Sequence, residues 1–243
     1  ANTYRNNVFD SCEGTLTLRH GNGCTVDGNY FFGHGAANTG GVRIIGERHR
    51  VFNNYFEGLT GNNQRSAISL VRGVENSELF EYFQVKDAQV AFNTIVNCKS
   101  GITANIGNST STMPVTDSRV TGNLIVNNAA GTPPEGVTVI AAYGPGIVWE
   151  ANHFHGVTVT GLTGGGVDGT ERFDLIRDGE LYLLPADKAT LYGKIRGFAY
   201  VATDIRGIAR PQNKTPGANE PTGERTRTIP SPATTGATWQ PTL

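Results

Sequence analysis

The chain has 243 residues, of which 37% are hydrophobic, 17% are charged and 32 are glycine. This composition favours many short strands joined by turns, and it excludes a collagen-like or generally low-complexity chain. The net charge of −1 gives no bulk field that would recruit nucleic acid or an anionic membrane, so we expect neither as a partner. Any site for an anion has to be local.

The three cysteines, Cys12, Cys24 and Cys98, form no C-x-x-C pair and have no metal-ligand spacing. We therefore predict that they are small buried residues and that this chain holds no metal site. The N-terminus has no basic segment followed by an apolar run, and nowhere do about eighteen apolar residues occur together. The sequence thus predicts neither a signal peptide nor a membrane span.

A short pattern repeats along the first two thirds of the chain: a small or polar residue, asparagine, any residue, and a hydrophobic residue. The asparagines are separated by 22, 25, 39, 30 and 29 residues, and they are Asn7, Asn29, Asn54, Asn93, Asn123 and Asn152. Most copies follow a segment with an apolar residue at every second position, which predicts a strand with one buried face. Stacking such units buries these faces in one continuous core, so the repeat indicates a solenoid.

We predict an all-β, right-handed parallel β-helix over residues 1–160, with the asparagines bonded in a ladder at one corner. The 39-residue interval marks a loop insertion around residues 59–82. Residues 161–212 are predicted to hold the terminal rungs and a hairpin, because "FDLIRDGELYLL" places an Asp-Gly turn between two strand-like segments. Residues 213–243 are rich in Pro, Thr, Gly and Asn, and we expect an extended tail that lies on the body or is partly disordered.

The strand "TLTLRHG" contains the first candidate site residue. Alternation sends Leu16 and Leu18 to the core and leaves Thr17 and Arg19 on the outer face. An exposed Arg is commonly only a solvated charge. Here, however, His20 follows directly and adds a titratable group beside the permanent cation.

The next rungs carry further basic residues, Arg43, His49 and Arg65, which converge with Arg19 if the rungs stack in register. Arg43 aligns with the inward-facing Leu18, so either a bulge intervenes or Arg43 points elsewhere. Arg65 lies in the predicted insertion, and long loops tend to carry binding groups. A basic stripe on a nearly neutral protein indicates an anionic substrate.

Glu47 and Tyr55 are weaker candidates for substrate binding, as is His49, because a turn carboxylate, a corner aromatic and a strand histidine occur in any β-helix. No convincing pair of carboxylates faces one groove, which argues against glycoside hydrolysis. A Ser-His-Asp mechanism lacks support because the sequence contains no Gly-x-Ser-x-Gly elbow.

The stretch from Asn2 to about Gly61, with its strings "LRHGNG" and "TGGVRI", closely resembles polysaccharide lyase family 6, the alginate lyases and chondroitinase B. The likeness continues weakly through "VAFNTIVNC" and "GNLIVNN", and "DIRGIARPQNKTPGANE" looks like the family's C-terminal end. The resemblance implies a β-helix that cleaves an acidic polysaccharide by β-elimination, with Ca2+ neutralising the uronate carboxylate. It also implies that Arg19 is the catalytic acid and that His20 contacts the substrate.

The chain departs from the family pattern at its start. In the family the lysine base lies a short distance upstream of the Arg motif, which here falls just before Ala1, and the Ca2+ ligands lie further upstream. The resemblance therefore implies a C-terminal portion of a lyase, inactive alone, with the missing N-terminal part of the same protein as a possible partner. Alginate is the expected substrate and a periplasmic or secreted location is expected. Dermatan sulfate as substrate, or polysaccharide binding without catalysis, remain the alternatives.

Overall fold

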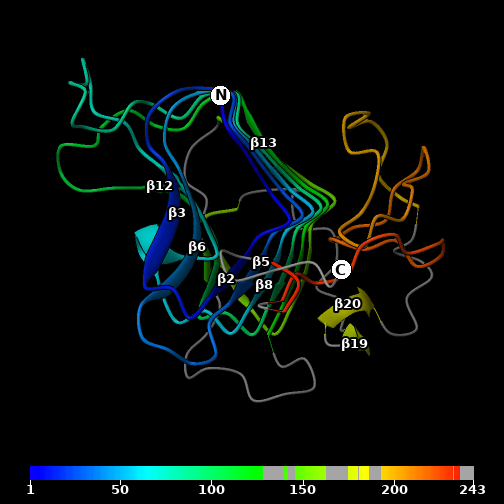
Figure 1. The fold of residues 1–243 in the computed structure, drawn as a ribbon. Coiled ribbons are helices and arrows are strands. Elements are labelled where there is room, and N and C mark those ends of the chain that lie inside the picture. Colours follow the sequence, from blue (N-terminus) through cyan, green and yellow to red (C-terminus); the bar gives the residue numbers. More distant parts are fainter. Residues whose placement is uncertain are drawn as a thin grey trace.

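The computed structural model describes residues 1–127, 139–141, 146–162, 175–179, 181–185, 193–231 and 233–235. In these residues the chain coils through three six-stranded sheets whose neighbouring strands are parallel, and each coil contributes one strand to each sheet (Figure 1). The predicted parallel β-helix is confirmed. Within the described part of the chain, no helix has the length and apolar character of a membrane span.

The three sheets are built from short strands. Sheet A contains β1 (Thr3–Arg5), β4 (Thr25–Asp27), β7 (Arg50–Phe52), β10 (Gln89–Ala91), β13 (Ser118–Thr121) and β16 (Ile147–Glu150). Sheet B contains β2 (Val8–Asp10), β5 (Tyr30–Phe32), β8 (Tyr55–Glu57), β11 (Thr94–Val96), β14 (Leu124–Val126) and β17 (His153–His155). Sheet C contains β3 (Gly14–Leu18), β6 (Thr39–Ile44), β9 (Ile68–Val71), β12 (Ser100–Ile106), β15 (Val139–Ala141) and β18 (Thr158–Thr160). A 3-10 helix, η1 (Asn63–Arg65), precedes β9.

A ladder of asparagine side chains connects the coils at the corner between sheets A and B, as predicted. Each amide donates to the Oδ1 of the asparagine one coil further on, at 2.8–3.0 Å, through Asn7, Asn29, Asn54, Asn93, Asn123 and Asn152. That Oδ1 also accepts the backbone N–H of the preceding ladder residue. From Asn29 onward, the amide additionally donates to a strand carbonyl of the previous coil. The buried amides therefore satisfy their polar groups by holding adjacent coils in register.

The corner is two residues long in every coil, and its first residue has a left-handed backbone. φ lies between +51° and +67° at the six positions, which include Gly28, Asn53 and Phe92. Glycine and asparagine adopt this conformation readily, whereas a bulky residue does not. Packing stabilises Phe92 in this left-handed conformation. The ring of Phe198 lies 5.3 Å from the Phe92 ring, and the Arg210 guanidinium lies 4.7 Å from the same ring. The repeat motif therefore reflects the backbone geometry of this corner.

Alternation along the strands fills the interior with apolar columns. In sheet B the rings of Phe9, Phe31 and Phe56 stack with centroids 4.5 and 4.7 Å apart. Ile95 pairs with Phe56 and continues the column, and both are fully buried. Each such side chain stabilises the fold by about 1.5–3 kcal/mol through burial of apolar surface.

The predicted loop insertion is corrected by the structure. The 39-residue interval contains an ordinary coil, because β9 pairs in register with β6 and β12. Two enlarged corners flank this strand: residues 58–67, which include η1, and residues 72–88. The repeat pattern could not separate them, since β9 is only four residues long and carries no corner motif.

The C-terminal region covers the outside of the β-helix. The predicted hairpin is confirmed as β19 (Leu175–Asp178) and β20 (Leu181–Pro185), which are antiparallel. Residues 193–231 form only isolated bridges, and residues 214–220 are buried. Residues 163–174, 180, 186–192, 232 and 236–243 lie outside the described residues, so the terminal rungs and tail predicted there are not seen.

The cysteine prediction is right for two residues and wrong for one. Cys24 and Cys98 are buried, whereas Cys12 is exposed, and all three are free thiols. Burial raises the pKa of Cys98 to about 12, so this thiol stays protonated at neutral pH.

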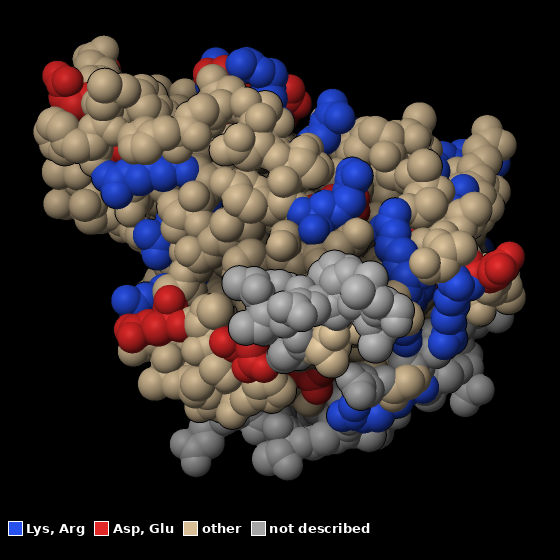
Figure 2. Space-filling model, viewed as in Figure 1, with Lys and Arg blue, Asp and Glu red and all other residues tan. Residues whose placement is uncertain are grey.

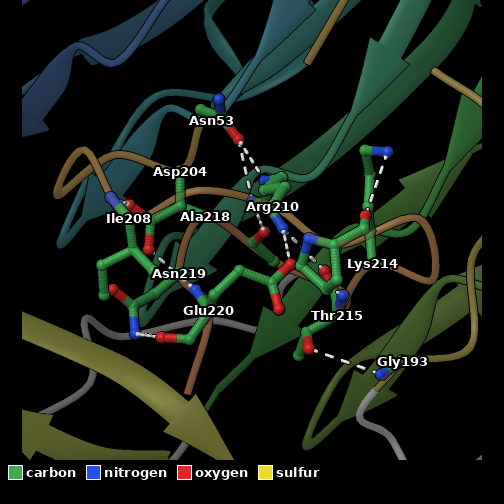
Figure 3. A network of polar contacts seen from close by, with 12 residues as sticks. Asn53, Gly193, Asp204, Ile208, Arg210, Lys214, Thr215, Ala218, Asn219 and Glu220 are labelled. Atoms are coloured by element: carbon green, nitrogen blue, oxygen red, sulfur yellow. Dashed lines mark hydrogen bonds and ion pairs between the residues drawn. The ribbon is translucent and has the colours of Figure 1, made fainter. Parts of the chain in front are cut away.

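A buried ion pair fastens the C-terminal segment to the ladder corner (Figure 3). Arg210 and Glu220 are 2.6 Å apart, and their side chains are 0% and 3% exposed. Arg210 also donates to the Oδ1 of Asn53, the residue before a ladder asparagine, at 2.8 Å. The Asp204 carboxylate accepts the backbone N–H of Glu220 at 2.8 Å. The segment is therefore held by charged groups that have partners inside the fold.

Removing a central ladder residue tests the role of the amide stack. Asn54→Ala should lower the free energy of unfolding by about 3 kcal/mol, because it leaves the buried backbone N–H and one amide N–H of Asn29 without an acceptor and removes one of the two donors to Asn93 Oδ1. Urea unfolding measures the change. Asn7→Ala, at the exposed end of the ladder, is the matched control and should lose much less. Equal losses in the two variants would contradict the structure.

A second stability comparison addresses the buried ion pair. Glu220→Ala should cost about 3–5 kcal/mol, because it leaves the Arg210 charge buried without its counter-ion. Glu150→Ala removes the 2.7 Å partner of Arg119, where both side chains are about half exposed, and should cost less than about 1 kcal/mol. Chemical unfolding of both variants gives the two values, and a small loss for Glu220→Ala would show that the C-terminal segment is not fastened this way.

Candidate functional site

The outer face of sheet C carries a row of polar side chains in register, formed by Thr17, Arg43, Ser69 and Thr103. Three of these side chains, Arg43, Ser69 and Thr103, hold η1 against the sheet. Arg43 Nε and Ser69 Oγ both donate to the backbone carbonyl of Gln64, at 3.0 and 3.2 Å. Thr103 Oγ1 donates to the carbonyl of Asn63 at 3.0 Å. The 3-10 helix therefore lies across this face because the row binds its backbone.

The orientation of Arg43 follows from a register shift, which decides between the two alternatives that the sequence left open. A β-bulge between β3 and β6 pairs Arg43 with the outward-facing Thr17 and not with Leu18. Close packing in β6 requires glycine nearby: a Cβ on Gly41 would lie 2.1 Å from the carbonyl oxygen of Ala67. The "TGGVRI" string thus directs the guanidinium outward.

A hollow of about 740 Å³ opens on this face. It is lined mainly by polar and basic residues, namely Arg43, Asn62, Asn63, Gln64, Arg65, Arg72, Asn105, Ile106, Gly107 and Asn108. None of these residues is Asp or Glu, and Glu13 reaches Arg65 at 3.7 Å. Arg72 Nε is buried without a hydrogen-bond partner among the described residues. Three guanidinium groups beside amides form a site suited to carboxylates.

The enlarged corner at residues 72–88 connects Arg19 with Arg43. The ring of Tyr82 lies 5.2 Å from Arg19 Cζ, and its hydroxyl accepts a hydrogen bond from Arg43 Nη1 at 3.3 Å. Arg19 also donates to the backbone carbonyl of Phe80. Two predicted site residues from successive coils therefore share one aromatic neighbour.

The other candidates take different positions. Arg65 lines the hollow, as the prediction of a binding role requires. His20 is exposed directly after Arg19. Glu47 lies at the corner after β6, where its carboxylate pairs with the neighbouring Arg48 at 2.7 Å. The structure thus groups Arg19 and Arg65 near one face, leaves His20 exposed beside Arg19, and gives Glu47 a local partner.

Tyr55 is not brought to this face. It lies in sheet B, is fully buried, and donates from its hydroxyl to Glu57 at 2.8 Å. Ile205 and Ala218 of the C-terminal segment belong to the apolar cluster that covers it. This position corrects the expectation that Tyr55 contacts substrate, because a segment about 150 residues away in the sequence occludes it.

His49 is a structural residue inside the β-helix. Its Nδ1 accepts the backbone N–H of Cys24 at 3.1 Å, and its Nε2 lies 2.9 Å from the carbonyl oxygen of Ile45. Because Nδ1 accepts, the ring proton is on Nε2. Burial lowers the pKa of His49, so the ring is neutral near pH 7.

Sequence reasoning missed several residues of this face. Tyr82 and Arg72 belong to an enlarged corner without a recognisable motif, and Asn105 lies at the end of β12. The one available signal was the long interval between two ladder asparagines, which marks extra chain but not the direction in which it folds.

The lining of the hollow does not fit a calcium ion. The described residues contain no group of three or more His, Cys, Asp or Glu side chains that could hold a metal. The charged groups that line the hollow are guanidiniums, which repel a cation. No chemical step on this face is therefore assigned to Ca2+.

The basic character of the hollow is local. Figure 2 shows separate groups of Lys and Arg, with Asp and Glu among them, rather than one continuous basic field. This distribution agrees with the net charge of −1. Attraction of an anionic ligand therefore depends on particular arginines and not on the charge of the whole molecule.

The fold and this face together define a β-solenoid with an arginine-lined hollow that suits anionic groups. A sequence profile of the family described as chondroitinase B matches residues 1–130. The chain belongs to this family, the PL6 polysaccharide lyases.

Solved structures agree with this assignment. The PL6 family alginate lyase AlyGC is 35% identical over 76% of this chain and 25% of its own, with a TM-score of 0.66. A variant of the same lyase gives 30% identity, 99% and 28% coverage and a TM-score of 0.70. A mannuronic acid specific family 6 lyase from human gut microbiota, 24% identical with a TM-score of 0.51, shares the fold. The chain thus spans about a quarter of the length of AlyGC. No protein of curated function matches it.

The lowered pKa of His49 predicts how stability depends on pH. Below about pH 6.5 the unfolded state binds a proton that the folded ring resists, so the free energy of unfolding should fall as the pH decreases. Urea titrations at several pH values measure this slope. His49→Gln should reduce the slope. Equal slopes in wild type and His49→Gln would contradict the assignment of a neutral buried ring.

Proposed function

We propose that this chain forms part of a lyase that cleaves a uronate-containing polysaccharide, with alginate as the substrate. The observation that carries the proposal is the hollow lined by Arg43, Arg65 and Arg72, with Arg19 joined to it through Tyr82. The similarity to an alginate lyase at 35% and 30% identity supports alginate. The family description supports dermatan sulfate as the alternative.

The reaction is a β-elimination. A base removes the C5 proton of the uronate, the electron pair forms a C4–C5 double bond, and the C4–O bond breaks. The leaving glycosidic oxygen takes up a proton. Negative charge develops on the uronate carboxylate and on the leaving oxygen, so cationic hydrogen-bond donors at both places lower the barrier.

The arginines match these two requirements. Arg43, Arg65 and Arg72 bind the carboxylates of successive sugar residues, since a guanidinium can donate two parallel hydrogen bonds to a carboxylate. Arg19, as the catalytic acid, donates the proton that the leaving oxygen takes up, and the exposed His20 contacts the sugar beside it.

The proton-abstracting base and the Ca2+ expected from the family are not assigned to residues of this chain. We propose that another part of the same protein supplies them, since the chain spans only about a quarter of the lyase it matches. Because polymeric uronates occur outside the cytoplasm, we also propose a periplasmic or secreted location.

Activity measurements on the protein expressed from its complete reading frame test this proposal. Ultraviolet absorbance of the unsaturated uronate should rise on alginate. Arg19→Ala should lower kcat by about a hundredfold or more, because the leaving oxygen loses its donor. Arg43→Ala should raise KM by about tenfold, because one charge-assisted hydrogen bond to a carboxylate is lost.

The matched control is Arg119→Ala, which removes the same charge from sheet A, where Arg119 pairs with Glu150. Its kcat and KM should equal those of the wild type. Product from dermatan sulfate alone would replace alginate as the substrate. Tight binding of either polymer without product would support a non-catalytic binding protein instead.

A further inference from the structure

We infer that Tyr82 is a positioning residue that sets Arg19 and Arg43 at a fixed separation beside the hollow. The inference rests on the proposed function, since it assigns a task to those two arginines in the same site. No sequence motif identifies Tyr82, and its role follows from two contacts made by opposite parts of one side chain.

The two contacts are chemically different. The ring face of Tyr82 lies 5.2 Å from Arg19 Cζ, which is a cation–π distance. Its hydroxyl accepts from Arg43 Nη1 at 3.3 Å. Arg43 Nε is already bound to the Gln64 carbonyl. Arg43 is therefore held at two of its nitrogens, and the remaining N–H groups are those that a carboxylate can use.

The orientation of Arg19 depends on Tyr82 more strongly than the orientation of Arg43 does. It lies just after the end of β3, so no strand pairing fixes its backbone. Its guanidinium is held by the Phe80 carbonyl and by the ring of Tyr82, both from the same corner. Because its Nε is buried without a hydrogen-bond partner among the described residues, these two contacts orient the group, and Tyr82 supplies the one made by a side chain.

The corner that carries Tyr82 is anchored well enough to position other groups. The Tyr82 carbonyl accepts the N–H of Val74 at 2.8 Å, which closes the loop. Gly73 exchanges two backbone hydrogen bonds with Met113, both 2.9 Å, and Gln84 Nε2 donates to the carbonyl of Pro114 at 2.7 Å. The loop is therefore tied to the next coil on both sides of the aromatic residue.

Close packing at the base of the loop supports this rigidity. A Cβ on Gly73 would lie 2.5 Å from the Cα and the N of Gln84. The backbones of Gly73 and Gln84, at the two ends of the loop, therefore lie in direct contact. Leu79 and Phe80, by contrast, are 76% and 73% exposed at its tip. Of the large side chains in this corner, Tyr82 is the one that contacts both arginines.

Two substitutions separate the two contacts. Tyr82→Phe keeps the ring beside Arg19 and removes the acceptor for Arg43. In the protein expressed from its complete reading frame, it should raise KM on alginate about fivefold and leave kcat within about twofold, because one hydrogen bond that orients Arg43 is lost. Tyr82→Leu removes both contacts and should also lower kcat about tenfold, because Arg19 loses its orientation. The matched control, Leu79→Ala, should match the wild type.

These outcomes decide the inference. Unchanged kinetics in Tyr82→Leu would overturn it. An equal loss of kcat in Tyr82→Phe and Tyr82→Leu would also overturn it, because the hydroxyl would then take part in the chemistry directly. The conservative variant must therefore rescue kcat.

A measurement independent of turnover distinguishes failure of the inference from failure of the proposed function. The NMR signal of the Arg19 Nε–H, assigned by its loss in Arg19→Lys, should shift in Tyr82→Leu when the ring current is removed and should remain nearly in place in Tyr82→Phe. If wild type cleaves neither polymer, the proposed function fails. If the signal does not move in Tyr82→Leu, the contact is absent and the positioning role fails.

Discussion

The asparagine ladder is the constraint on which the rest of the molecule depends. Each buried amide satisfies its donors and acceptor only if the next coil lies directly above it, so hydrogen bonding holds adjacent coils in one register. Residues on the outer face of sheet C consequently fall into straight rows. Thr17, Arg43 and Ser69 are neighbours for this reason, although they are more than twenty residues apart in the sequence. The hollow on sheet C therefore depends on the register that the asparagine ladder sets at the corner between sheets A and B.

The fold could be predicted because its determinants are local and repeated. A left-handed corner position selects glycine or asparagine, the ladder selects asparagine, and alternation selects apolar residues, all within a few positions. Even the exception is informative, since Phe92 occupies a left-handed position with support from Phe198. The Asp-Gly hairpin was predictable on the same local grounds. Family resemblance added the family of the chain, which the profile match to residues 1–130 establishes.

The site was only partly predictable, because non-local contacts complete it. Arg19, Arg43 and Arg65 could be found as basic residues on successive coils, but their common neighbours could not. Whether Arg43 faced inward depended on a bulge. Tyr55 has the sequence context of a surface aromatic, yet a distant C-terminal segment covers it. Where a loop folds back or a C-terminal segment crosses a sheet, residue type and spacing do not indicate which residues of the chain will be in contact.

The unequal corners of the coil have a consequence for how such proteins diversify. The turn between sheets A and B has two residues in every coil, whereas the turns on either side of sheet C range from a few residues to more than fifteen. Residues can thus be added or exchanged in the corners beside the hollow without disturbing the asparagine ladder that holds the coils in register. Grafting corners between relatives should therefore be a practical way to alter which ligand the hollow accepts, with thermal tolerance inherited from the recipient scaffold.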